Sequence, residues 1–303
     1  MTVWSFESAG SLPQIGNRLV SAPEPLIRNI SDTALWAALY RARESDRPDA
    51  VFRDPFARRL AGARGQEIAE AMPYSERQAW AWVARTFVFD QFVTKQVAQG
   101  VDMVINLAAG LDARPYRMDL PTALRWIEVD FPEILAEKEA ILKMEAPRCA
   151  LERVGLDLSN VTARRELFNR LGRTASKVLV ITEGLLVYLS AEEVIALAQD
   201  LALPESFRRW IVDLVSPGLL RILQRHLQPN LDQAGATLRF GPKEGPLFFE
   251  PLGWKPIEVK TMLKTAAQLN RLSFWMRLLA KLPDSPGAQG SRPWGGACLL
   301  VRD

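Results

Sequence analysis

The sequence predicts an α/β protein built on a mostly parallel, doubly wound β-sheet. Residues 101–117 form a short run rich in Val, Ile and Leu that breaks into small residues and a glycine, which is typical of a strand buried on both faces and followed by a tight turn. Further apolar runs alternate with helical patterns later in the chain, which indicates parallel strands joined by crossover helices. Asp130 ends the second run, twenty residues after Gly110, where doubly wound folds bind the ribose of an adenosine cofactor.

Length and composition indicate one large α/β domain with an extension. The chain has 303 residues, 48% of them hydrophobic and 24% charged, and it contains no long spacer rich in Gly, Ser or Pro. We therefore expect residues 1–98 to form an N-terminal arm and helical cap, and residues 99–303 to form the sheet domain. The net charge is +3, and basic residues occur in pairs such as Arg58 and Arg59 rather than in blocks, which argues against a nucleic-acid partner.

The two cysteines and the lengths of the apolar runs are used to predict the cellular compartment of the protein. Cys149 and Cys298 have no metal-ligand spacing around them, so we interpret them as reduced thiols of a cytoplasmic protein without a bound metal. Residues 1–10 lack a secretory pattern, and no apolar run approaches 18 uninterrupted residues. We therefore expect no signal peptide and no membrane partner, while the oligomeric state is left open.

The N-terminal part is expected to be helical after an irregular arm of residues 1–30. Helices are expected at residues 32–43, 56–60 and 76–98. Ser31 is a suitable N-cap for the first, Gly62 is expected to end the second, and Ser75 with Gln78 forms a capping-box pattern before the third. The third helix is apolar nearly all round, so we expect it to lie between the sheet and the other N-terminal helices.

The rest of the chain predicts seven strands, at residues 102–107, 125–130, 150–156, 177–182, 209–215, 255–260 and 296–302. Helices are expected between the early strands, at residues 132–144, 161–171 and 191–202. Pro132 suits the first turn of the first of these, and Ser190 with Glu193 predicts a capping box for the last. Residues 217–252 interrupt the alternation with an amphipathic helix, 219–227, and loops rich in Gly and Pro. An insertion of this kind often covers a substrate site.

The turn after the first strand is suited to contact between the backbone and a ligand. The glycine frame of dinucleotide-binding folds is occupied by Ala108, Gly110 and Ala113, so only the middle glycine is present. The loss of the other two argues against a pyrophosphate and favours an adenosine without phosphates, such as S-adenosylmethionine. A small-residue turn with no ligand is the alternative, since such turns are common in α/β proteins.

Three motifs together resemble the leucine carboxyl methyltransferase family: residues 104–118, 127–132 and 181–189. The family includes enzymes that methylate protein C-termini and bacterial O-methyltransferases of polyketide and related pathways. The resemblance extends from about Asp32 to the C-terminus. It implies a class I methyltransferase fold, which is a Rossmann-like seven-stranded sheet with its last strand antiparallel and an N-terminal helical cap, and it implies S-adenosyl-L-methionine as the cofactor.

The resemblance also implies how the cofactor is bound. Asp130 would bind the ribose hydroxyls, and Asp157 with Leu158 would frame the adenine. Arg85 and Gly110 would hold the carboxylate end of the methionine part. For Arg85 the alternative is a structural salt bridge, and Asp157 is as well placed to cap the following helix.

Further cofactor contacts are expected beside these. Glu183 would meet the amino group of the methionine part, and Ala108 and Asp112 belong to the turn around Gly110. The expected strand ends carry five acidic residues, Asp112, Asp130, Asp157, Glu183 and Asp213. A carboxylate cluster suits a cationic ligand, and both the sulfonium and the amine of S-adenosylmethionine are positive.

The choice of acceptor depends on whether the site contains a general base. A carboxylate is already ionised at neutral pH, whereas an alcohol or phenol must lose a proton. His226, the single histidine, lies in the expected covering helix and is a candidate base, although an incidental surface role is the more common one. Tyr188 and Arg114 are candidates to bind an acceptor carboxylate; a core hydroxyl and a salt bridge to Asp112 or Asp130 are their alternatives.

The departures from the family pattern favour a small natural-product acceptor over a protein C-terminus. Ala108 stands where the family has glycine, and the first helix carries Trp36 and Ala37 where protein-methylating members have a lysine nearby. We therefore expect O-methylation of a carboxylate or hydroxyl in secondary metabolism. Protein C-terminal methylation, a nicotinamide-dependent oxidoreductase and a non-catalytic cofactor-binding protein are the alternatives.

Overall fold

The computed structural model describes residues 32–72, 77–232, 235–283 and 290–302. The expected arm of residues 1–30, the cap Ser31 and the capping-box residue Ser75 lie outside these ranges. Gln78 is described, and it precedes helix α4 without a side-chain capping hydrogen bond.

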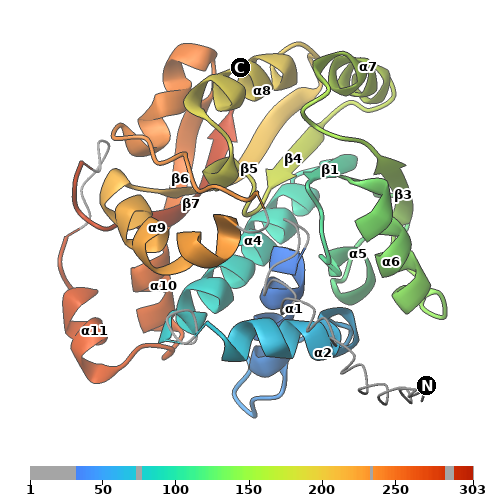
Figure 1. Ribbon diagram of the computed structural model, residues 1–303. Coiled ribbons are helices and arrows are strands. Elements are labelled where there is room, and N and C mark those ends of the chain that lie inside the picture. Colours follow the sequence, from blue (N-terminus) through green and yellow to red (C-terminus); the bar gives the residue numbers. More distant parts are fainter. Residues whose placement is uncertain (1–31, 73–76, 233–234, 284–289, 303) are drawn as a thin grey trace, which may run out of the picture.

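A seven-stranded sheet forms the centre of the molecule, in the order β3-β2-β1-β4-β5-β7-β6 (Figure 1). The strands are β1 Met103–Leu107, β2 Arg125–Asp130, β3 Ala150–Gly155, β4 Val178–Thr182, β5 Phe207–Val215, β6 Lys255–Thr261 and β7 Gly295–Val301. The first five are parallel to one another, and β7 is antiparallel to both β5 and β6. The predicted class I sheet with an antiparallel last strand is therefore confirmed.

Alternate residues of the central strands belong to two different cores. Ile105 of β1 packs with the helices on one face, α7 Val161–Gly172 and α8 Ala191–Leu201. Its neighbour Val104 packs on the opposite face with α4 Ala79–Ala98. All five residues of β1 are buried, as expected for a parallel strand that is covered on both sides.

Local signals fix several helix starts as the sequence predicts. Pro132 is in the first turn of α6 Pro132–Leu142. The Ser190 hydroxyl accepts from the Glu193 amide at 3.2 Å, and the Glu193 carboxylate accepts from the Ser190 amide at 2.7 Å. This reciprocal capping box opens α8 and satisfies two amides that would otherwise lack partners.

The N-terminal helices pack on α4. Helix α1 Asp32–Ser45 lies against α2 Ala57–Glu70 and α4, and the rings of Trp36 and Trp82 are 5.1 Å apart. Helix α4 also contacts β5 and β7, so the prediction that it lies between the sheet and the N-terminal helices is confirmed. The predicted end of the second helix at Gly62 is wrong, because the chain kinks there with φ +57° and then continues as a helix.

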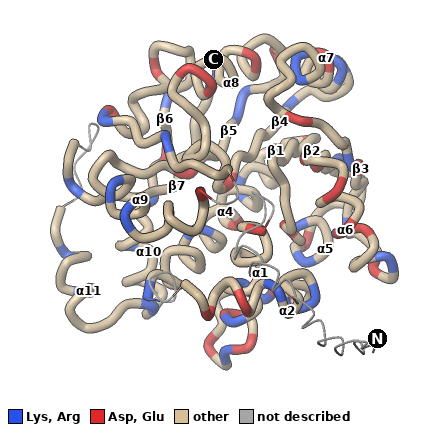
Figure 2. Tube along the Cα trace, in the orientation of Figure 1, with Lys and Arg blue, Asp and Glu red and all other residues tan. Residues whose placement is uncertain are grey.

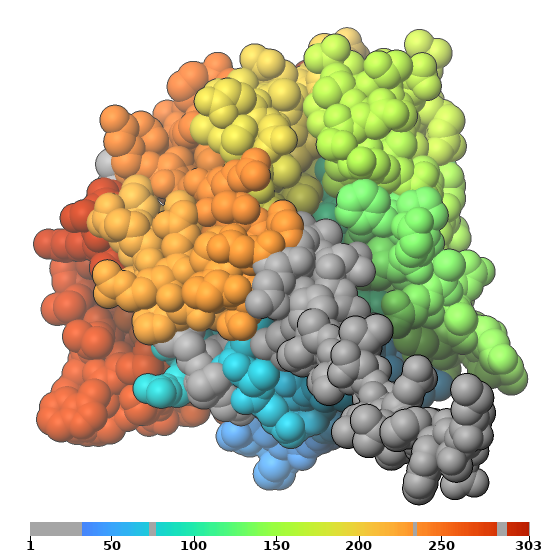
Figure 3. All heavy atoms as spheres, viewed as in Figure 1, coloured from blue at the N-terminus to red at the C-terminus, as the bar shows by residue number. Residues whose placement is uncertain are grey.

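Two helices lie in the segment after β5. Helix α9 Pro217–Leu231 contacts β5, and the 3-10 helix η3 Gly245–Leu252 contacts α8, β5 and β6. Together they belong to a yellow-to-orange block on the face of the molecule shown in Figure 3. Three short helices fall where no helix was predicted, α5 Arg114–Arg117, α10 Met262–Gln268 and α11 Phe274–Leu279, as does the 3-10 turn η1 Leu186–Tyr188.

Both cysteines are free and buried, which agrees with their interpretation as reduced core thiols. Burial raises the pKa of Cys149 to about 11. Among the described residues, no helix has the length and apolarity needed to cross a bilayer, and no group of three or more His, Cys, Asp or Glu is placed to hold a metal ion.

Candidate functional site

A cavity of about 1270 Å³ lies at the carboxyl ends of the parallel strands. All five predicted acidic strand ends line it, Asp112, Asp130, Asp157, Glu183 and Asp213. Ligands bind at this edge in open α/β sheets, because the strand-to-helix turns leave a crevice there. The cavity is larger than most small-molecule sites, so it has room for more than one ligand.

The turn after β1 is hydrogen-bonded to the end of β2. The Gly110 amide donates to the Asp130 Oδ2 at 2.6 Å, and the Phe131 amide donates to Oδ1 of the same carboxylate at 2.8 Å. Gly110 has φ +47°, a conformation that glycine adopts without steric cost. A Cβ at this position would lie 3.1 Å from the Ala34 Cβ, so helix α1 packs closely against the turn.

Ala108 has φ +53°, which is unusual for a residue with a Cβ and costs about 1 kcal/mol. The alanine therefore keeps the left-handed turn where the resembled family has glycine, and it lines the cavity.

Asp130 is a half-buried carboxylate that no described cation pairs with. Burial raises its pKa above the ordinary value, and the amides of Gly110 and Phe131 offset part of that rise. A carboxylate accepts about four hydrogen bonds, so positions for further donors are left on the side of the cavity. This is the environment that a pair of ribose hydroxyls requires.

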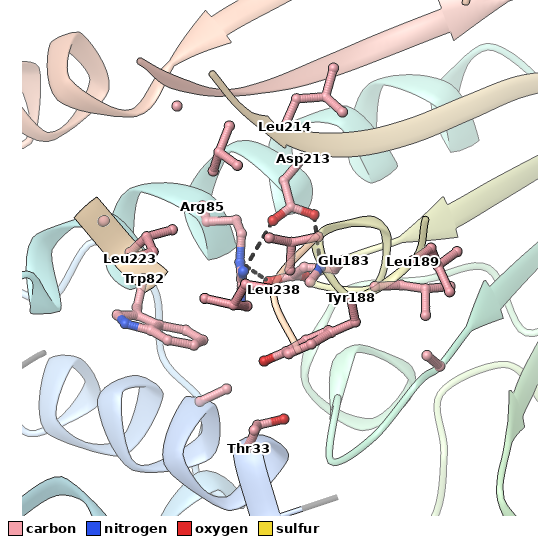
Figure 4. Close-up of a pocket in the computed structure, with 18 of the residues that line it drawn as sticks. Thr33, Trp82, Arg85, Glu183, Tyr188, Leu189, Asp213, Leu214, Leu223 and Leu238 are labelled. Carbon is pink, nitrogen blue, oxygen red and sulfur yellow. Dashed lines mark hydrogen bonds and ion pairs between the residues drawn. The ribbon is translucent and has the colours of Figure 1, made fainter. Parts of the chain in front are cut away.

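Arg85 connects helix α4 to the ends of β4 and β5. Its Nε lies 3.1 Å from the Glu183 Oε1, and its Nη1 lies 3.1 Å from the Asp213 Oδ2 (Figure 4). The other oxygen of Asp213 accepts from the Gly184 amide at 2.7 Å. Burial disfavours the charged guanidinium, but Asp213 and Glu183 outweigh it and raise the pKa of Arg85. The alternative of a structural salt bridge is therefore present for Arg85, with these two strand-end carboxylates as its partners.

Arg114 is only 2% exposed and is held by three carboxylates. Its Nε lies 2.7 Å from Asp90, and its Nη1 lies 2.8 Å from both Asp112 and Glu183. The predicted alternative of a salt bridge to Asp112 is thus present, whereas Asp130 is not among the described ion-pair partners of Arg114. With its donors engaged in this way, Arg114 is a positioning residue for Glu183 and Asp112, and the geometry does not support it as the group that binds an acceptor.

Asp112 is held ionised by this network. Burial opposes its ionisation, but the charges of Arg114, Lys138 and Arg117 outweigh that effect, so its pKa lies far below the ordinary value. Its carboxylate also accepts from the Asn106 side chain at 2.8 Å and from the Arg114 amide at 2.9 Å. Asp112 therefore fixes the turn after β1 in addition to lining the cavity.

Asp157 and Leu158 line the cavity beyond β3, as predicted. Asp157 is exposed, and its Oδ1 accepts from the Ser159 amide at 2.8 Å. The alternative role of Asp157 as the cap of the next helix is wrong, since Asn160 caps α7 by accepting from the Ala163 amide.

Tyr188 lies in the cavity with its hydroxyl toward Thr33 of α1 (Figure 4). Burial raises the pKa of the phenol, while a hydrogen bond with the Thr33 side chain and the charge of Arg85 offset part of that rise. A phenol with a raised pKa stays protonated at neutral pH, so Tyr188 is a hydrogen-bond donor rather than a base.

His226 is exposed on α9 and is not among the residues that line the cavity. The lining residues of this helix are apolar, Leu219, Ile222, Leu223, Leu227 and Leu231. The prediction that His226 is a candidate base is therefore not supported by its position, because the apolar stripe of an amphipathic helix faces the cavity and the histidine falls outside that stripe.

The structure adds three residues that the sequence interpretation did not single out. Asp90 of α4 pairs with both Arg114 and Arg117 at 2.7 Å. The guanidinium of Arg85 lies 4.6 Å from the centre of the Trp82 ring, and Thr33 bonds Tyr188. A single acid at Asp90, five residues after Arg85 in an otherwise apolar helix, is the signal that was available.

The geometry fits S-adenosylmethionine. Four carboxylates, Asp90, Asp112, Glu183 and Asp213, are tied to three guanidinium groups, Arg85, Arg114 and Arg117. One negative charge is left over within this network, and Asp130 adds another. A ligand that carries a sulfonium and an amine complements this excess.

Comparisons with known proteins agree with this geometry. Residues 34–202 match the model of the leucine carboxyl methyltransferase family. A protein from Frankia alni, named an S-adenosyl-L-methionine-dependent methyltransferase, is 30% identical over 257 residues, which are 79% of this chain and 88% of the relative. A protein of the same name from Parafrankia is 36% identical over 181 residues, which are 56% of this chain and 58% of that one, so this match spans less than two thirds of the relative.

Solved structures share the fold. A DUF574 family protein from Streptomyces avermitilis has a TM-score of 0.56 at 12% identity, over 88% of this chain and 97% of that chain. A methyltransferase from Thermobifida fusca has a TM-score of 0.54 at 16% identity, over 92% of this chain and 96% of that chain. On the family match, which covers more than half of its residues, the chain belongs to the leucine carboxyl methyltransferase family, a family of S-adenosylmethionine-dependent methyltransferases.

Proposed function

We propose that this enzyme transfers the methyl group of S-adenosyl-L-methionine to the carboxylate of a small, apolar natural-product acid. The observation that carries the proposal is that, among the described residues, no histidine lines the cavity and each acid that lines it already accepts from an arginine or a backbone amide. The single histidine is exposed outside it, and Glu183 and Asp213 are paired with Arg85. A carboxylate acceptor needs no base because it is already ionised at neutral pH, whereas an alcohol does need one.

The cofactor would occupy the polar half of the cavity. Asp130 would accept from the ribose hydroxyls, Leu158 and Asp157 would border the adenine, and Glu183 would accept from the amine. When bound, the cofactor supplies a methyl group on a positively charged sulfur. An anionic nucleophile would attack the methyl carbon in line with the departing sulfur. Ala108 and Gly110, on the turn whose positive φ angles bring the backbone to the cavity, would let the main chain lie against it.

The chain's own residues would align the acceptor and exclude water. Methyl transfer depends mainly on alignment in a dry site, and the apolar residues of α9 supply such a wall. Tyr188 would donate its phenolic proton in a hydrogen bond to one acceptor oxygen, which leaves the other oxygen free to attack. Arg114 would act indirectly by holding Glu183 in place.

The cavity wall that α9 and the loop up to Arg239 form supports a small acceptor. Leu223 of α9 and Leu238 of the following loop line the cavity together with Trp82 and Arg85 (Figure 4). An extended protein C-terminus would need a polar channel, whereas this wall is apolar. We also propose that residues 1–98 act as the helical cap on the sheet domain of residues 99–303, and that the enzyme works in the cytoplasm in secondary metabolism.

The chemical class of the product tests the proposal. The enzyme is incubated with methyl-labelled cofactor and with pairs of compounds that share one apolar skeleton and end in either a carboxylate or an alcohol. We expect label in the acids, and we expect mild alkali to release it as methanol, because esters hydrolyse there and ethers do not. Label only in the alcohols, stable to alkali, would show that the acceptor is a hydroxyl. Cofactor binding without transfer to either class would contradict a catalytic role.

A further inference from the structure

We propose that helix α11 and the turn after it dock the enzyme on the surface of an anionic lipid bilayer, beside the mouth of the cavity. The docking surface consists of Phe274, Trp275, Leu278, Leu279 and Leu282. These are five of the twelve exposed large hydrophobic residues in the described part of the chain, with exposed fractions from 42% for Leu278 to 74% for Trp275. Their concentration within nine residues is unusual for a solvated surface.

The helix presents this surface outward. With about 100° between successive residues, Phe274, Trp275, Leu278 and Leu279 fall within one arc of about 140°. Met276 and Ala280 fall on the opposite side, where Ala280 is buried and Met276 packs against the core beside α4 and α10. The helix is therefore anchored by its inner face, while the apolar side chains of its outer face are exposed. Helix α11 lies at the edge of the molecule (Figure 1).

The charged residues of the docking segment are basic. Residues 274–282 carry Arg277 and Lys281 and no acidic residue, and Asp284 is the next acid along the chain. The tube is free of red along α11 (Figure 2), while nearby Arg271 is already paired with Glu44 and Asp49. Arg277 and Lys281 border one side of the apolar arc. Aromatic and aliphatic side chains bordered by basic residues match an interface where acyl chains lie beneath anionic headgroups.

The same residues form the rim of the cavity. Leu279 and Leu282 are more than half exposed and also line the cavity, together with Met276 and Ala280. A lipophilic acid could thus pass from the bilayer into the apolar half of the cavity without crossing water. This route rests on the proposed function, whereas docking on a bilayer does not depend on it.

A second copy of this chain is a poorer occupant. Self-association through the same patch would bring Arg277 and Lys281 of two copies together without an acidic residue on the docking segment to compensate them, and like charges repel at such an interface. An anionic bilayer instead supplies the opposite charge together with an apolar layer.

Vesicle sedimentation tests the proposal. The full chain is mixed with vesicles of phosphatidylcholine alone and of phosphatidylcholine with phosphatidylglycerol. The test variant is F274S/W275S, whose positions do not line the cavity. The control is L203S/I257S, which changes side chains of 60% and 58% exposure elsewhere. We expect binding to the anionic vesicles that raised salt weakens, a loss of about tenfold in the test variant, and no loss in the control.

Each other outcome counts against the proposal. Absence of wild-type binding to anionic vesicles, or equal binding by the test variant, would overturn it. A concentration-dependent dimer that the test variant abolishes, without vesicle binding, would assign the surface to a second copy. Thermal stabilisation of the wild type by S-adenosylhomocysteine is measured in parallel. Absence of stabilisation would count against the proposed function, whereas the vesicle result would still decide the docking proposal on its own.

Discussion

The two halves of the cavity are lined by residues of opposite polarity. The half at the ends of β1, β2, β4 and β5 is a network of carboxylates and guanidinium groups with bonds of 2.6 to 3.1 Å. The half under α9, α10 and α11 is lined mainly by Leu, Ile and Met. The first half has directed polar groups for a defined ligand, whereas the second recognises shape and apolarity. The difference indicates that the cofactor is selected by hydrogen bonds and charge, and the acceptor mainly by exclusion of water.

Removing the central cation of the polar half should have the largest effect. Replacing Arg114 with methionine would leave Asp112 and Glu183 buried without their shared partner, at a cost of about 3–5 kcal/mol in the free energy of unfolding. Urea denaturation measures this loss. The control Arg58→Gln breaks an exposed ion pair with Asp46 and should cost less than about 1 kcal/mol. Equal stability of the two variants would show that the buried network does not hold the polar half together.

Cofactor affinity should depend next most strongly on Asp130. Asp130→Ala removes the proposed acceptor of two ribose hydroxyl hydrogen bonds, each worth about 1.5–3 kcal/mol when the acceptor is charged. We expect the affinity for S-adenosylhomocysteine to fall by at least about 100-fold in a calorimetric titration. Glu133→Gln, at an exposed position near the start of α6, is the matched control and should bind normally. Unchanged affinity in Asp130→Ala would show that the ribose does not bind at the end of β2.

The pH dependence of cofactor binding should distinguish Asp130 from Asp112 within the polar half of the cavity. Burial raises the pKa of Asp130, whereas nearby cations keep that of Asp112 far below its ordinary value despite burial. In the proposed role, the ionised form of Asp130 accepts hydrogen bonds from the ribose hydroxyls. Affinity should therefore be full at pH 7 and fall as the pH drops through the raised pKa, by about tenfold per unit below it. Titration of the wild type and of Asp130→Asn measures this, and a flat profile in the wild type would contradict it.

The apolar half should affect only the acceptor. Leu223→Ser places a hydroxyl in the wall of α9 and removes apolar contact, which should raise the acceptor KM by about fivefold to tenfold. Cofactor affinity should stay at the wild-type value. A comparable loss of both affinities would mean that the two halves are not separate.

Tyr188 joins the two halves, and its removal should have the smallest effect. Tyr188→Phe keeps the ring and removes one hydrogen bond, worth about 0.5–1.5 kcal/mol, so turnover should fall by up to about tenfold with cofactor affinity unchanged. Steady-state kinetics with the best acceptor measures this. Unchanged turnover would leave Tyr188 with a structural contact to Thr33 alone.

The sheet could be predicted from the sequence because its signals are local. Strands such as Arg125–Asp130 are short apolar runs that end in turn residues, and their observed bounds match the predicted ones within about two residues. The helix after Gly62 was missed because a glycine in the left-handed region can kink a helix as well as end it. Helix α11 was missed because it is short and its apolar face is turned outward, so that the periodicity of a buried face is absent.

The site could be predicted in part. The strand-end acids and Arg85 line one cavity because the topology of parallel strands brings their ends together. The ion-pair partners of Arg114 depend on Asp90 in a distant helix, which no sequence spacing encodes. The position of His226 depended on which face of α9 turns inward, and the irregular segment around it gave no such constraint.

The central claim is that the polar half of the cavity binds an adenosyl sulfonium and no dinucleotide. Calorimetric titration of the wild-type protein with S-adenosylmethionine, S-adenosylhomocysteine and NADH tests it most directly. We expect one site per chain for the first two ligands, with affinity lost in Asp130→Ala, and no heat of binding for NADH. Binding of NADH in preference to both adenosyl ligands would contradict the claim.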